Sequence, residues 1–120
     1  MPRRTPMSTE MRERVAAQFR ALGEPSRLHL MSLLFDGERT VGELVTESGL
    51  SLANASKQLG LLHRAGWVTR RKVGLNVVYA LADVRTHDLC EIMCSRVRER
   101  AAAEAAFATR GTLVPRRKAR

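Results

Sequence analysis

The stretch of the sequence most suited to chemistry runs from Ser51 to Gly66, which contains no acidic residue and offers small and polar side chains on one face of its first half. Side-chain amides can bond adenine, hydroxyls suit a base edge or a phosphate, and lysine suits guanine or phosphate. An acidic group here would be repelled by the phosphates that line a DNA groove. The residues that we expect to contact the major groove of double-stranded DNA are Ser51, Ala53, Asn54, Ser56, Lys57 and Gln58.

Basic residues follow at once, in a segment with the composition of a β-hairpin. Two short runs rich in β-branched and aromatic residues, 67–71 and 77–81, flank a loop at 72–76 that contains Gly74. A positively charged loop can lie along the phosphate backbone or enter the minor groove, which positions a protein without specifying sequence. The DNA-binding residues expected in this segment are Arg70, Arg71, Lys72 and Asn76.

The third feature with possible chemistry is the pair Cys90 and Cys94, which have no partners elsewhere in the sequence. On a helix the two Cβ atoms would lie about 6 Å apart, too far for a disulfide without local unwinding. Two thiolates could bind a soft ion such as As(III), Cd(II) or Zn(II), with a further ligand from His87 or a partner chain. A redox switch and the plain packing of two small apolar side chains are the alternatives. The cofactor therefore stays open between a soft metal or metalloid ion and none.

Capping signals and apolar periodicity predict the elements that would position these residues. Four helices begin at Ser8 or Thr9, at Pro25, at Thr40 with Glu43 as a capping box, and at Ser51. The third and fourth helices are joined by a glycine-containing turn at 48–50, which is the helix-turn-helix arrangement. After the hairpin, a long helix is expected over 83–108, since this segment lacks Gly and Pro.

Length and composition limit the protein to a few classes. The 120 residues are enough for one domain, which we expect over 9–108 between basic, disordered segments at 1–8 and 109–120. Only 4% of residues are aromatic, so the core must be aliphatic. The net charge of +9 indicates a polyanionic partner, either nucleic acid or an anionic membrane surface. No apolar run approaches the ~20 residues that span a bilayer, and a cytoplasmic protein is expected.

Together the matching segments resemble the arsenical-resistance repressor (ArsR/SmtB) family of winged helix-turn-helix regulators. The resemblance is carried by residues 19–28, 40–44, 51–59, 62–68 and 78–81. It implies a mainly α-helical fold with a small β-hairpin, and a homodimer that represses its promoter until an effector binds. Two ligand sets common among the family's metal sensors are missing: Thr40 and Gly42 replace a cysteine pair, and His87 is the only histidine in 84–100.

The resemblance also implies that the first and last helices join the two protomers. An apolar stripe on the last helix is larger than so small a monomer can cover, and a dimer would read a pseudo-palindromic operator. The interface residues expected are Met11, Val15 and Phe19 on the first helix and Leu89, Met93 and Val97 on the last.

Other classes of function fit the sequence less well. A nucleophile motif and a phosphate-binding glycine loop are both missing, so an enzyme is not expected. A winged-helix protein without a metal site is the alternative, acting by constitutive DNA binding or by binding a protein partner. A membrane partner is not expected, because the basic segment at 116–118 has no amphipathic companion.

Overall fold

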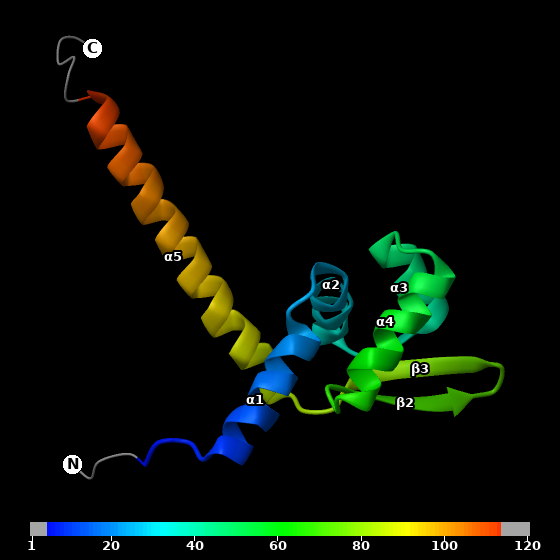
Figure 1. The fold of residues 1–120 in the computed structure, drawn as a ribbon. Helices are drawn as coiled ribbons and strands as arrows, with labels where there is room; N and C mark the ends of the chain where they lie inside the picture. Colours follow the sequence, from blue (N-terminus) through cyan, green and yellow to red (C-terminus); the bar gives the residue numbers. More distant parts are fainter. Residues whose placement is uncertain (1–4, 114–120) are drawn as a thin grey trace. The chain divides into compact units, whose positions relative to one another are not determined.

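The computed structural model describes residues 5–113, with side chains as far as residue 109. The chain forms two compact units, one ending at Val84 and the other beginning at Arg85. The elements, drawn in Figure 1, are α1 (Thr9–Leu22), α2 (Pro25–Leu33), a 3-10 turn (Leu34–Asp36), β1 (Arg39–Thr40), α3 (Val41–Ser48), α4 (Leu52–Arg64), β2 (Val68–Val73), β3 (Asn76–Leu81) and α5 (Arg85–Leu113).

The predicted helix starts are confirmed. The hydroxyls of Ser8, Thr40 and Ser51 each accept a hydrogen bond of 3.1 Å from the backbone N–H three residues ahead. The Thr40 cap is a complete capping box, because the Glu43 carboxylate also accepts from the Thr40 N–H at 2.8 Å. Local sequence therefore fixes where each of these helices begins.

The core of the first unit is aliphatic, as the composition predicts. Tyr79 is its one buried aromatic side chain among the described residues. Each buried leucine stabilises the fold by about 1.5–3 kcal/mol relative to exposure, and this cluster packs α2, α3 and α4 against the sheet. Its most deeply buried members are Leu30, Met31, Leu34, Leu44, Leu59 and Leu62.

The β-sheet has one strand more than the sequence indicated. Its antiparallel order is β1-β3-β2, and the two residues of β1 pair with the middle of β3. The hairpin turn is tighter than predicted: only Gly74 and Leu75 separate β2 from β3. Gly74 has φ +62°, which the two-residue hairpin turns require at their first position. The hairpin projects past α4 with this turn at its free end (Figure 1), where Leu75 is 99% exposed.

The second unit is the helix α5, which is longer than predicted. It runs to Leu113, past the expected end at 108, and it includes Gly111. A single glycine costs a helix only about 1 kcal/mol, so it need not end one. Residues 109–113 are helical, so the expectation of a disordered segment beginning at 109 is wrong for these five residues. The rest of the two expected disordered segments, apart from 5–8, lies at 1–4 and 114–120, outside the described residues. No described helix is long and apolar enough to cross a membrane.

Candidate nucleic-acid interface

Helix α4 has one buried and one exposed face, as a groove-reading helix requires. Ala55, Leu59 and Leu62 are fully buried against the core. On the other side Ala53, Ser56 and Lys57 are exposed and Asn54 is half-buried. Ser51 is exposed at the N-cap, where its oxygen is used by the Asn54 N–H and its hydroxyl hydrogen remains available to a phosphate. Small side chains at the start of α4 allow close approach to a duplex.

The expectation that Gln58 lies on the outer face of α4 is wrong. Gln58 is only 8% exposed, because it is one turn from Asn54 on the side that faces α2. Its amide oxygen accepts from Arg27 Nη1 at 2.8 Å, and its amide nitrogen donates to Asn54 Oδ1 at 3.1 Å. Gln58 therefore contacts Asn54 from the buried side of α4 and is not available to a base.

The hairpin presents its cations on both faces. Strand residues alternate between faces, so Arg70 and Lys72 share one face and Arg71 lies on the other. All three are exposed, and so is Asn76 at the start of β3. The register pairs Arg70 with Tyr79 and Arg71 with Val78, which places both arginines in the middle of β2 rather than at its tip. The positive charge thus extends along the strand.

Arg71 is held by an acidic partner that no local pattern in the sequence indicates. Its Nη1 and Nη2 atoms donate to the two carboxylate oxygens of Glu38 at 2.8 and 2.9 Å. This double hydrogen bond lowers the pKa of Glu38 and raises the pKa of Arg71. Glu38 therefore neutralises one of the cations expected to bind phosphate.

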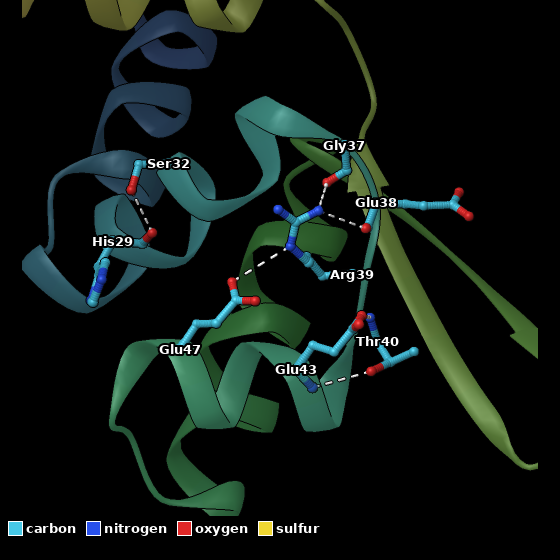
Figure 2. A network of polar contacts seen from close by, with 8 residues as sticks. All are labelled: His29, Ser32, Gly37, Glu38, Arg39, Thr40, Glu43 and Glu47. Carbon is cyan, nitrogen blue, oxygen red and sulfur yellow. Dashed lines mark hydrogen bonds and ion pairs between the residues drawn. The ribbon is translucent and has the colours of Figure 1, made fainter.

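The neighbouring residues turn Glu38 toward the hairpin. Arg39 donates to the carbonyls of Gly37 and Glu38 and pairs with Glu47 of α3 at 3.5 Å. Figure 2 shows the Arg39 side chain directed toward Glu47, whereas the Glu38 side chain points the opposite way. Successive residues of this extended segment point to opposite sides, so the Arg39–Glu47 ion pair lies against α3 and the Glu38–Arg71 ion pair lies against β2.

Sequence reasoning assigned no functional role to Arg27 or Glu38. Their partners lie 31 and 33 residues away in the chain, so no local spacing relates them. The one available signal for Arg27 was that it is the single Lys, Arg, Asp or Glu residue of the short helix α2, where a partner for its charge is to be expected.

The residues expected at a dimer interface are apolar and largely exposed within the single chain. On α1, Met11 and Phe19 are exposed and Val15 is half-buried. On α5, taken by itself, Leu89, Met93 and Val97 are exposed. Large apolar side chains at helical spacing on a surface are typical of protein–protein contacts.

Both cysteine thiols are free, with Cys90 half-buried and Cys94 exposed. Burial, and to a smaller extent the neighbouring Cys94, raise the pKa of the Cys90 thiol. Among the described residues no group of three or more His, Cys, Asp or Glu side chains could hold a metal ion. His87 therefore does not complete a site with the two cysteines, and the described part of one chain offers an ion at most these two thiols.

Comparisons with known proteins agree with this geometry. The family described as bacterial regulatory protein, arsR family, matches residues 24–70, from α2 into β2. The SmtB homolog of Synechocystis, described as a transcriptional repressor, is 37% identical over 78% of this chain and 70% of its own length. This chain belongs to the ArsR family. Its fold is a winged helix-turn-helix, and the family that it matches is one of bacterial regulatory proteins.

This ArsR-family chain is similar in fold to several proteins of known structure. The crystal structure of Rv0081 from Mycobacterium tuberculosis has a TM-score of 0.71 at 32% identity, covering 82% of this chain and 99% of that one. In the sequence comparison, the match covers 62% of this chain and 64% of the length of Rv0081. The Mycobacterium bovis protein Mb0332, described as a homodimeric winged helix-turn-helix DNA-binding domain, has a TM-score of 0.69 at 28% identity, over 83% of this chain and 95% of that one.

Proposed function

We propose that this ArsR-family chain is a cytoplasmic, homodimeric repressor that binds a pseudo-palindromic DNA operator through the start of α4 and the β2–β3 hairpin. One observation carries this proposal. Apart from Leu52, the exposed side chains at the start of α4 are small, polar or basic, and the adjoining hairpin adds the exposed cations Arg70 and Lys72 beside the paired Arg71. The side chains at the start of α4 can enter a major groove, and the cations of the hairpin can bind the flanking phosphates.

Dimerisation is supported by the apolar side chains exposed on α1 and α5. Two protomers related by a twofold axis would place two α4 helices on one face of a duplex, about one helical turn apart. Each half of the operator would then be read by one helix and held by one hairpin. The relative Mb0332, described as homodimeric, supports the same assembly.

The proposal is tested by measuring affinity for the DNA upstream of the protein's own gene and for random duplexes, at physiological salt. A specific regulator should prefer its operator by roughly 10³-fold or more. Lys57→Glu combined with Arg70→Glu should weaken binding to both duplexes. Arg14→Glu on α1 is the matched control for a reversed charge, because Arg14 is exposed and pairs with Glu10 of the same helix. Equal affinity for operator and random DNA would reject sequence-specific repression and favour a protein that coats DNA.

We propose further that the effector of this repressor reacts with Cys90 and Cys94. The support is chemical: the two thiols are free, one turn apart on α5, and one of them is exposed. Two thiols suit a soft ion or a metalloid, and they also suit an oxidant. Operator binding of the wild type should weaken with arsenite, Cd(II) or a mild oxidant, and Cys90→Ala/Cys94→Ala should not respond. A double variant that responds like the wild type would leave these cysteines as packing residues and favour a different effector or constitutive binding.

A further inference from the structure

A chain of hydrogen bonds runs from the end of α1 to the DNA-facing side of α4. It begins at Arg27 of α2, whose guanidinium donates to the carbonyls of Ala21 and Arg20 at the C-terminal end of α1. The remaining arm of the same guanidinium donates to Gln58 Oε1 at 2.8 Å. Gln58 Nε2 then donates to Asn54 Oδ1 at 3.1 Å.

The direction of this chain is fixed by its first member. A guanidinium has five N–H donors and no acceptor, so only the oxygen of the Gln58 amide can face it. The Gln58 NH₂ group must then face Asn54, and only the oxygen of the Asn54 amide can receive it. Gln58 is buried, so water is not a ready substitute for either partner, and reversing its amide would leave donors facing donors.

We infer that Arg27, acting through Gln58, sets which bases Asn54 can recognise: Asn54 turns its NH₂ group to the major groove and keeps its oxygen on the protein. This inference rests on the proposed function, because it assumes that α4 reads DNA. It makes Gln58 and Arg27 positioning residues that determine specificity without touching a base. Among the described residues, the Asn54 side chain forms its hydrogen bond through Oδ1, and no described group accepts a hydrogen bond from Nδ2.

The consequence is a preference for hydrogen-bond acceptors on the base edge. A free Asn amide can bond adenine through both of its ends, donating to N7 and accepting from the N6 amino group. With its oxygen turned toward Gln58, Asn54 cannot present both ends of its amide to one base edge, so it meets the groove as a donor through Nδ2. The major-groove edges that satisfy a donor best are the O6 and N7 atoms of guanine and the O4 atom of thymine, because the N7 atom of adenine lies beside the N6 amino group, a donor that would face the Asn54 NH₂ group. Guanine or thymine is therefore expected opposite Asn54.

Gln58→Glu reverses the chain with almost no change of shape. One carboxylate oxygen still accepts from Arg27, so the buried charge is paired. The other oxygen can only accept, so Asn54 must rotate and offer its NH₂ group to the protein. Its oxygen then faces the groove, where the amino groups of adenine N6 and cytosine N4 are the matching donors. A single buried substitution should switch the preferred base at one operator position.

The test is selection from a library of randomised DNA duplexes by the full-length wild type, Gln58→Glu and Asn54→Ala, with sequencing of the bound fraction. The operator position opposite Asn54 is the one at which Asn54→Ala removes base preference. At that position the wild type should select guanine or thymine, and Gln58→Glu should select adenine or cytosine. For the two matched duplexes, the ratio of affinities should change by about tenfold, as expected for one hydrogen bond gained and one lost.

Gln58→Met serves as the second variant, because it fills the space of Gln58 and neither donates nor accepts. It should relax the preference at this position rather than reverse it, and thermal unfolding of each variant confirms that it is folded. Selection of the same base by the wild type and Gln58→Glu would overturn the inference. An unchanged set of preferences in Asn54→Ala would overturn it too, while leaving specific binding by α4 intact. Failure of the wild type to enrich any sequence would instead overturn the proposed function.

Discussion

Replacing Glu38 with glutamine should make DNA binding stronger and more sensitive to salt. In the wild type the Glu38 carboxylate holds both Nη atoms of Arg71, at 2.8 and 2.9 Å, and cancels its charge. The substituted glutamine side chain would be nearly the same size but uncharged, so the Arg71 guanidinium would become available to a phosphate. The Glu38 and Arg71 side chains are both at least half exposed to solvent. An ion pair in such a position contributes little to stability, so the fold does not depend on it.

The size of the effect follows from the number of phosphates neutralised. Each additional phosphate contact steepens the slope of log K against log salt by ~0.9, so one new contact per hairpin gives about 1.8 for a homodimer. Between about 50 and 200 mM salt, this extra slope corresponds to a further loss of affinity of roughly twelvefold. Because the slope counts phosphate contacts, it separates this effect from a general improvement in folding.

The assay is fluorescence anisotropy with one labelled duplex over a range of salt concentrations. Glu99→Gln is the matched control, since it removes an exposed acid from α5 and leaves the hairpin unchanged. The double variant Glu38→Gln/Arg71→Gln should return the slope to near that of the wild type. Because Arg71 lowers the pKa of Glu38, the carboxylate stays charged as pH falls through the usual glutamate range. Mild acid should therefore not reproduce the mutation.

Two results would refute this explanation. If Glu38→Gln and Glu99→Gln steepen the slope equally, the effect is one of net charge alone. If Glu38→Gln leaves the slope unchanged, Arg71 is not a phosphate-binding group at all.

Three further outcomes are expected. Thr40→Ala removes the hydroxyl half of a complete capping box and should lower the free energy of unfolding by about 1 kcal/mol in denaturant titrations; no change would mean that α3 does not depend on its cap. Gly74→Ala has open space around the new Cβ but φ +62°, so it should cost about 1–2 kcal/mol of backbone strain, and a variant as stable as the wild type would contradict the turn geometry. Because the pKa of Cys90 is raised, its alkylation by iodoacetamide, followed by mass spectrometry, should need a higher pH than that of free cysteine; equal rates at neutral pH would contradict this.

Sequence alone predicted the features that local chemistry determines. Capping residues predicted the starts of α1, α3 and α4. The composition predicted an aliphatic core. These features depend on neighbours within a few residues, which a sequence displays directly.

Features that depend on distant partners could not be predicted in this way. The strand β1 is two residues long and exists because the middle of β3 is beside it. Gln58 looked like a groove residue because it is polar and follows Lys57, yet a guanidinium 31 positions earlier draws it into the fold. Arg71 looked like a free cation because it lies between two other basic residues, whereas the distant Glu38 is its partner.

The most direct test of the central claim is an NMR titration of the full-length, ¹⁵N-labelled protein with duplex DNA from upstream of its own gene. The account predicts that amide signals shift or broaden first at the start of α4, in residues 51–57, and along the hairpin, in residues 68–77. Perturbations confined to other parts of the chain, with these two segments unchanged, would contradict the claim that this surface binds DNA.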